Sequence, residues 1–156
     1  MDTKQIIFKI GNEQYGIDIL KVHEIENANN IVPVPNSQEC VLGIMHLRDS
    51  VIPIYSLRRK FNMDDYEITQ KDEEPQKLII AASKDMEIGF LVDRVEEIME
   101  IKDSQIFNTP RIVRNEDTAY IDRVACVNKK IIILLNVDAI VSDEEMEDIA
   151  VMVEDV

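Results

Sequence analysis

Short apolar runs separated by polar residues predict two β-hairpins in the first part of the chain. The first joins 6–10 to 15–19, because a Gly-Asn-Glu sequence supplies a turn between them. The second joins 41–45 to 51–55 across the polar insert 46–50. Between the two hairpins, the sequence LKVHEIE fits a short turn and a strand equally well.

Prolines shape the second hairpin. Pro33 and Pro35 fix φ and remove amide donors, so the chain should approach the hairpin in an extended form. Pro53 removes another donor inside an apolar run, which indicates an edge strand or a bulge. The following segment, 57–63, places two apolar residues four positions apart and predicts a short helix.

Further strands are predicted after an acidic segment. Residues 64–76 are poor in apolar residues, which is typical of a solvated loop. Apolar runs at 78–82 and 88–92 predict a third hairpin, and the pattern typical of strands continues through 95–101. The run 131–135, IIILL, is too short for a helix and continuously apolar, so we expect a central strand that is buried on both faces.

A helix is predicted at the C-terminal end, over 142–154. Ser142 and Glu145 have the spacing of a capping box. Apolar residues follow at helical spacing: Met146, Ile149, Ala150 and Val153. We expect this apolar face to dock on the rest of the fold; the alternative is that it binds a partner.

An internal repeat relates the two halves of the chain. The segment 16–25 is matched by 89–98 with four identities in register, and 44–61 can be laid over 124–141. A repeat of this length indicates a duplicated small barrel, because a solenoid needs more copies of a shorter unit. Closing each sheet into a barrel would also hide most strand edges.

These patterns predict a single mainly β domain over 1–156. The first subdomain should span approximately 12–63 and the second approximately 77–141, while the N-terminal strand could join either. The predicted C-terminal helix follows the second subdomain.

Composition narrows the class of partner. The chain contains 46% hydrophobic residues, no tryptophan and 5% aromatic residues, so its core must consist mainly of Ile, Val, Leu and Met. A formal charge of −14 repels nucleic acid and anionic lipid. Cys40 and Cys126 lie far apart in sequence and indicate no disulfide framework. Without a signal peptide or an apolar run of about 18 residues, we expect a cytoplasmic protein that does not insert into membranes.

Candidate catalytic chemistry is sparse. His23 lies beside Glu24 and Glu26, and together with His46 these residues raise the alternative of a small metal-dependent enzyme. The chain has no His-x-x-x-His spacing, its four glycines are scattered, and its serines lie in no nucleophile motif. We therefore expect no catalytic residue, metal ion or cofactor.

Four motifs in order resemble the CheW family, the adaptors of bacterial chemotaxis arrays. They are YGIDILKVHEI at 15–25, the Pro-Val-Pro sequence at 33–35, GIMHLRDSVIPI at 43–54 and VDRVEEI at 92–98. The resemblance implies two SH3-like five-stranded β-barrels with short helices. It also implies an adaptor that couples the hairpin tip of chemoreceptors to the regulatory domain of the histidine kinase CheA. A divergent scaffold for a kinase pathway outside chemotaxis is the alternative.

The resemblance also implies roles for particular residues. An ion pair would join Glu24 to Arg48. The receptor groove would contain Ile19, Val22, Ile25 and Leu78. The kinase would contact the region of Leu42, Gly43 and Val51. The residues alone leave two questions open, since Arg48 could serve a structural bidentate bond or a partner, and the apolar residues could belong to a core or to a groove. The family usually has Asn-Leu-Arg-Gly where this chain has HLRD at 46–49, which could change the hairpin tip.

Overall fold

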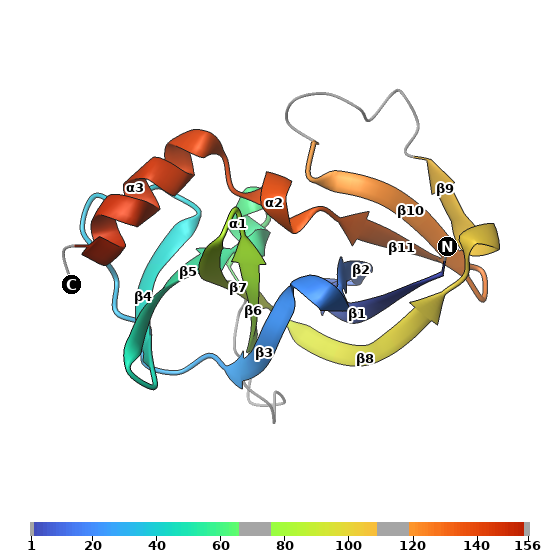
Figure 1. Ribbon diagram of the computed structural model, residues 1–156, viewed down its shortest axis with the longest axis horizontal. Helices are drawn as coiled ribbons and strands as arrows, with labels where there is room; N and C mark the ends of the chain where they lie inside the picture. The colour runs from blue at the N-terminus through green and yellow to red at the C-terminus, as the bar shows by residue number, and fades with distance from the viewer. Residues whose placement is uncertain (1, 66–75, 109–118, 155–156) are drawn as a thin grey trace.

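Two β-sheets form the body of the protein (Figure 1). The structure is a computed structural model that describes residues 2–65, 76–108 and 119–154. The strands are β1 (Thr3–Ile10), β2 (Glu13–Asp18), β3 (Val22–Asn27), β4 (Val41–Leu47), β5 (Ser50–Ser56), β6 (Lys77–Ser83), β7 (Met86–Val92), β8 (Arg94–Ile101), β9 (Ile106–Asn108), β10 (Ile121–Val127) and β11 (Lys130–Leu135). The helices are η1 (Ile19–Lys21), α1 (Leu57–Lys60), η2 (Asp103–Gln105), α2 (Val137–Ile140) and α3 (Asp143–Glu154). The predicted mainly β class is confirmed, and the two sheets are consistent with SH3-like barrels.

The two halves of the chain exchange hairpins. Sheet A has the strand order β8-β1-β2-β11-β10-β9, and sheet B has the order β3-β6-β7-β5-β4. Each sheet therefore combines one hairpin from one half with the later strands of the other half. Parallel pairs complete the exchange, with Gly16 opposite Leu134 in sheet A and Gly89 opposite Ile54 in sheet B. The predicted repeat is thus visible as equivalent positions in the two sheets.

The predicted subdomain ranges do not coincide with these sheets. The ranges 12–63 and 77–141 assume that each half closes on itself. Instead, the β6–β7 hairpin pairs with β3 and β5 of the first half, and the β1–β2 hairpin pairs with β8 and β11 of the second. Sheet A also has six strands in place of the expected five, because the short β9 adds to β10.

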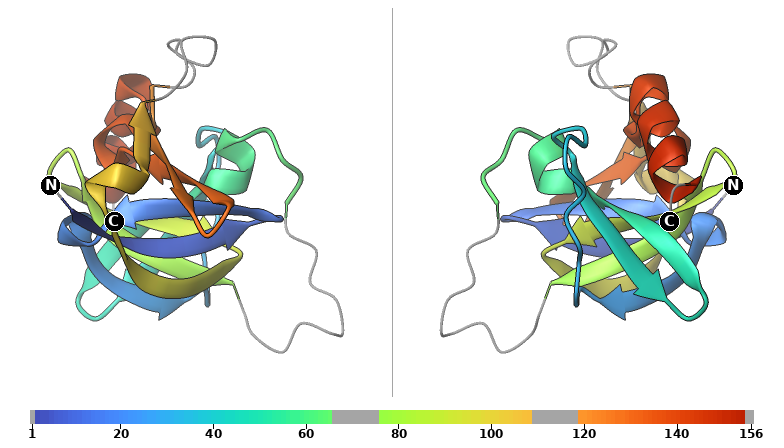
Figure 2. Two further views of the ribbon diagram at one scale, coloured as in Figure 1. Left: turned by 90° about the vertical axis from the view of Figure 1, so that its right-hand side faces the viewer. Right: turned by 90° about the vertical axis from the view of Figure 1, so that its left-hand side faces the viewer.

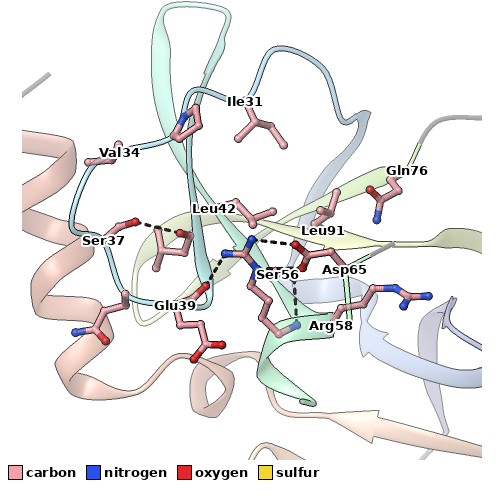
Figure 3. A pocket seen from close by; sticks show the side chains of 14 residues that line it. Ile31, Val34, Ser37, Glu39, Leu42, Ser56, Arg58, Asp65, Gln76 and Leu91 are labelled. Carbon is pink, nitrogen blue, oxygen red and sulfur yellow. Dashed lines mark hydrogen bonds and ion pairs between the residues drawn. The ribbon is translucent and has the colours of Figure 1, made fainter. Parts of the chain in front are cut away.

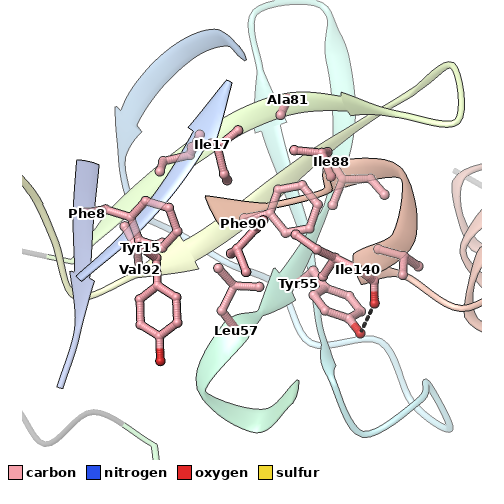
Figure 4. Close-up of a cluster of buried hydrophobic side chains, with 14 of the residues drawn as sticks. Phe8, Tyr15, Ile17, Tyr55, Leu57, Ala81, Ile88, Phe90, Val92 and Ile140 are labelled. Carbon is pink, nitrogen blue, oxygen red and sulfur yellow. Dashed lines mark hydrogen bonds between the residues drawn. The ribbon is translucent and has the colours of Figure 1, made fainter. Parts of the chain in front are cut away.

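Three apolar clusters fill the fold. The central cluster lies between the sheets and includes Phe8, Tyr15, Tyr55 and Phe90 (Figure 4). The interior of sheet A contains Ile7, Ile101, Ala125, Ile132 and Leu134. The interior of sheet B contains Met45, Ile52, Ile54, Leu78 and Ile80. The central cluster draws on both sheets, so the two sheets share one core.

The predicted C-terminal helix and its capping box are confirmed. The Ser142 amide donates to Glu145 Oε1 at 3.0 Å, and the Glu145 amide donates to Ser142 Oγ at 3.1 Å. The helix packs beside β5 (Figure 2), with Ile149 buried in the central cluster. Glu147 and Asp148 are exposed, as expected for the polar face.

Several local predictions need correction. β11 lies inside sheet A, as expected, with Ile132 and Leu134 buried on one face and Leu135 on the other, but Ile131 is exposed near the hairpin tip. β5 is an interior strand, and Pro53 is tolerated there because the ladder to β7 begins one residue later, at Ile54. The predicted helix at 57–63 ends at Lys60. Most of the predicted loop at 64–76 lies outside the described residues.

Candidate functional site

Apolar residues predicted to line a groove lie on η1 and β3, at one edge of sheet B. Ile19 and Val22 are half-buried and pack against the central cluster, whereas Ile25 is exposed. Ile25 pairs with Ile79, a member of the central cluster, so the two side chains share one face of sheet B. These three residues form a partly exposed edge of that cluster.

The prediction that Leu78 lines the groove is wrong. Its side chain is completely buried in the interior of sheet B. Successive residues of β6 point to opposite faces, so Ile79 reaches the central cluster while Leu78 reaches the interior. Leu78 therefore supports the barrel and is not available to a partner.

Two further apolar residues occupy equivalent positions on β8, at an edge of sheet A. Val95 is half-buried against the central cluster, and Ile98 is 59% exposed. Ile98 pairs with Ile6, another member of that cluster. The sequence repeat aligns Ile25 with Ile98 and so indicates that the two positions are equivalent. Ile98 was nevertheless not among the predicted site residues. The central border is defined here as Ile19, Val22, Ile25, Val95 and Ile98.

Glu24 and Arg48 meet beside this border. Arg48 Nη2 donates to Glu24 Oε2 at 3.0 Å, and the Arg48 and Glu24 side chains are 76% and 20% exposed. This is a single contact, so the bidentate bond considered from the sequence is not formed. Because solvent screens so exposed a pair, its contribution to stability is small. Most of the guanidinium remains accessible to a partner.

The Arg48 backbone has an unusual conformation. The β4–β5 turn consists of Arg48 and Asp49 between paired Leu47 and Ser50. Arg48 has φ of 57°, a region that residues other than glycine, asparagine and aspartate seldom adopt. The turn therefore places an arginine at the position where the local backbone would favour a smaller residue.

The residues predicted to contact a kinase have different surroundings. Gly43 is buried, and a Cβ there would lie 2.1 Å from the Val32 carbonyl oxygen. This close approach allows two backbone hydrogen bonds between Val32 and Ile44, of 2.8 and 2.9 Å. Gly43 therefore positions the preceding segment, while Leu42 and Val51 remain half-buried.

A pocket of about 550 Å³ lies between residues 31–42, α1 and β7 (Figure 3). Arg59 donates to both carboxylate oxygens of Asp65, at 3.1 and 3.0 Å, and to the Glu39 carbonyl oxygen at 2.8 Å. The hydrogen bonds from Arg59 lower the pKa of Asp65. The Arg59 and Asp65 side chains are 32% and 62% exposed, so their ion pair lines the pocket but adds little to its stability. No sequence pattern predicted this pocket.

Among the described residues, the histidines belong to no group of side chains that could hold a metal ion. His23 Nδ1 lies 2.8 Å from Glu87 Oε1. Across residues 2–65, 76–108 and 119–154, no group of three His, Cys, Asp or Glu side chains is arranged to hold a metal ion. Within the same ranges, no helix has the length and hydrophobicity needed to span a membrane.

Comparison with known proteins identifies the family. The family model of the CheW-like domain matches residues 4–145. The chain belongs to the CheW family. The chemotaxis protein CheW of Klebsiella aerogenes is 30% identical over 141 residues, which cover 90% of this chain and 82% of the relative. CheW of Bacillus subtilis is 26% identical, with 92% of this chain and 90% of the relative covered.

A solved structure supports the same conclusion for the fold. The scaffolding protein TtCheW from Thermoanaerobacter tengcongensis superposes with a TM-score of 0.80 at 28% identity, covering 93% of this chain and 96% of that chain. The resemblance inferred from four sequence motifs is therefore confirmed. The protein is a CheW-type adaptor of chemotaxis signalling. The CheW-like match ends at residue 145, so most of α3 lies beyond it.

Proposed function

We propose that this CheW protein couples chemoreceptors to the histidine kinase CheA in the cytoplasm, with the central border as the receptor site. The observation that carries this assignment is the pair of exposed isoleucines, Ile25 and Ile98, at equivalent edges of the central cluster. A helical hairpin offers apolar side chains at helical spacing, which suit such a border. Hydrophobic contacts would supply the affinity, and the charge of −14 would select which partners approach.

The kinase is assigned to the end of sheet B that carries the β4–β5 hairpin. Arg48 lies in the turn of this hairpin, half-buried Val51 follows just after the turn, and half-buried Leu42 lies near the other end of β4. An exposed arginine is typical of interface residues that contribute strongly to binding. Gly43 supports this region through the backbone and does not offer a side chain.

Matched surface substitutions test the receptor site. Ile98→Glu places a charge in the central border, whereas Val151→Glu places the same charge on α3, at a side chain that is 58% exposed compared with 59% for Ile98. A purified receptor cytoplasmic fragment with its hairpin tip should bind Ile98→Glu at least about ten-fold more weakly than wild type. Val151→Glu should bind normally. Equal binding by both variants would contradict the assignment of the central border.

The kinase site is tested at Arg48. Arg48→Ala should leave the fold intact, because the lost ion pair is exposed, but should reduce co-sedimentation with receptor and CheA. Circular dichroism checks the fold in parallel. Normal recovery of the ternary complex with the variant would argue against a role for Arg48.

The proposal includes no reaction at this protein. Metal analysis of purified protein provides an independent check. Stoichiometric zinc or manganese would favour an enzyme that uses His23 and nearby carboxylates, and would contradict a purely binding function.

A further inference from the structure

The C-terminal arm, defined as residues 136–154, connects the two sheets. It leaves sheet A at the end of β11 and continues through α2 to α3, which packs beside β5 of sheet B (Figure 1). Val137, Ile140 and Ile149 of the arm are buried in the central cluster. The arm is therefore an ordered part of the domain core, although its last helix lies mostly outside the CheW-like match.

Polar contacts hold α2 against the β6–β7 turn. Buried Ser83 donates through Oγ to the Val137 carbonyl oxygen at 2.9 Å. The Lys84 amide donates to Asp138 Oδ1 at 2.8 Å, and Lys84 Nζ donates to Asp143 Oδ1 at 2.6 Å. These bonds place Asp138 at a defined position above the turn.

Asp138 also contacts the segment that carries the central border. Lys21 Nζ donates to Asp138 Oδ2 at 3.0 Å. Lys21 is the last residue of η1 and lies in sequence between Ile19 and Val22. The other end of η1 is held by Asp18, whose Oδ1 accepts from the Leu20 amide at 2.9 Å. The η1 turn is thus contacted at one end by its own cap and at the other by the arm.

We propose that the C-terminal arm acts as a strap that positions η1, so that Asp138 is a positioning residue for partner binding at the central border. This inference rests on the proposed receptor site. Lys21 is the link, because its side chain ties the border segment to an element that does not itself belong to the border. The Lys84 amide and the Lys21 ammonium together lower the pKa of Asp138, in keeping with a carboxylate that serves both. Because coupling between two sites is reciprocal, partner binding should in turn stabilise the arm.

Asp138→Asn is the most selective test of the strap. The amide side chain keeps an oxygen for the Lys84 amide but loses the charge that attracts Lys21. In the free protein, hydrogen exchange of the Leu20 and Lys21 amides should increase about two- to five-fold, as expected for loss of an exposed ion pair. Unchanged exchange at η1 would overturn the proposal whether or not the receptor site is correct.

A double-mutant cycle with Lys21→Gln separates positioning from direct contact. Affinity for the receptor cytoplasmic fragment should fall about two- to five-fold in each single variant, and no further in the double variant. If Lys21 instead contacts the receptor directly, Lys21→Gln will weaken binding more than Asp138→Asn and the effects will add. That result, or wild-type affinity in Asp138→Asn, would overturn the strap.

The binding and exchange measurements together distinguish a failure of the strap proposal from a failure of the proposed receptor site. If wild-type protein fails to bind the fragment, the proposed function fails, while the exchange measurement still decides whether the arm positions η1. If wild-type protein binds and the singles weaken binding non-additively, both proposals stand.

Discussion

Two junctions at equivalent places in the two halves use opposite arrangements of charge. At the first, Asp93, between β7 and β8, accepts from Arg58 of α1 and from the Gly11 amide, at 2.7 Å from the amide. At the second, Asp138 of α2 accepts from Lys21 and from the Lys84 amide. In both junctions, the backbone amide of a hairpin turn and a cationic side chain bind one carboxylate. In the first junction the helix supplies the cation and the connection between two strands supplies the carboxylate. In the second junction the helix supplies the carboxylate and the connection between strands supplies the cation.

Burial separates the two junctions energetically. The side chains of Arg58 and Asp93 are 17% and 10% exposed, whereas those of Lys21 and Asp138 are 46% and 41% exposed. Arg58 also binds Asp93 with two nitrogens, through Nε and Nη2, while lysine contributes a single point contact. The duplicated backbone therefore accommodates a rigid junction on one side and a weakly held one on the other.

Removing the buried cation should produce the largest difference. Arg58→Ala leaves the carboxylate of Asp93 nearly buried, with the Gly11 amide as a donor, and should lower the free energy of unfolding by about 3 kcal/mol. Lys21→Ala should cost less than about 1 kcal/mol, because its pair is exposed. Urea unfolding of both variants provides the comparison. Equal losses would show that burial does not distinguish the junctions.

A second variant tests the reason for the Arg58 effect. If the cost comes from the unpaired carboxylate, Asp93→Asn in the Arg58→Ala background should restore part of the lost stability. A further loss in the double variant would mean that the packing of the Arg58 side chain matters more than the charge.

One equivalent position of the barrel interiors is polar in sheet A and apolar in sheet B. Extending the repeat alignment pairs Gln5 of β1 with Leu78 of β6, and both side chains are buried. Gln5 Nε2 donates to Thr3 Oγ1 at 3.1 Å, but within the described residues its Oε1 lacks a hydrogen-bond partner. Gln5→Leu should therefore raise the free energy of unfolding by about 1 kcal/mol, by removing an unsatisfied acceptor.

The reciprocal change controls for volume and position. Leu78→Gln introduces a polar group into the apolar interior of sheet B and should lower stability in the same urea assay. A destabilised Gln5→Leu would indicate that Oε1 has a role that apolar packing cannot replace.

The β4–β5 and β10–β11 hairpin turns differ in which residues adopt the left-handed backbone conformation. In the β10–β11 turn, Asn128 and Lys129 have φ of 52° and 67°, whereas in the β4–β5 turn Arg48 has φ of 57° and pairs with Glu24. Arg48→Asn should change stability by no more than about 0.5 kcal/mol, because asparagine tolerates this backbone while the exposed ion pair is lost. Complex formation with CheA should nevertheless fall as in Arg48→Ala. A large loss of stability would assign Arg48 a mainly structural role.

Local sequence patterns anticipated local structure well. The hairpins, the capping box of α3 and the repeat depend on residues close in sequence or on a direct internal match, so periodicity and turn chemistry were sufficient. The exchange of hairpins depends instead on parallel pairing between β2 and β11, which no local pattern encodes. For the same reason, the contact of Lys21 with Asp138 could not be read from the sequence.

Candidate site residues illustrate the same limit. Leu78 and Ile79 are adjacent apolar residues of one strand, and only the fold determines that both are buried on different faces. Ile98 could have been found, because the repeat aligns it with Ile25. Gly43 required knowledge of the Val32 carbonyl that packs against it.

The smallest expected effect is the pH dependence of the exposed junction. Hydrogen bonds from the Lys84 amide and Lys21 place the pKa of folded Asp138 below its ordinary value of about 3.9. Its contribution is therefore present above the unfolded pKa and is lost as pH falls through the folded pKa. The free energy of unfolding of wild type should exceed that of Asp138→Asn by about 0.5 kcal/mol at pH 7, after screening, and the difference should disappear once the pH falls below the folded pKa of Asp138 in urea titrations. In a Lys21→Gln background the difference should already be smaller at pH 7, because one of the two donors is missing; a difference that grows on acidification would show that Asp138 does not act as a charged acceptor.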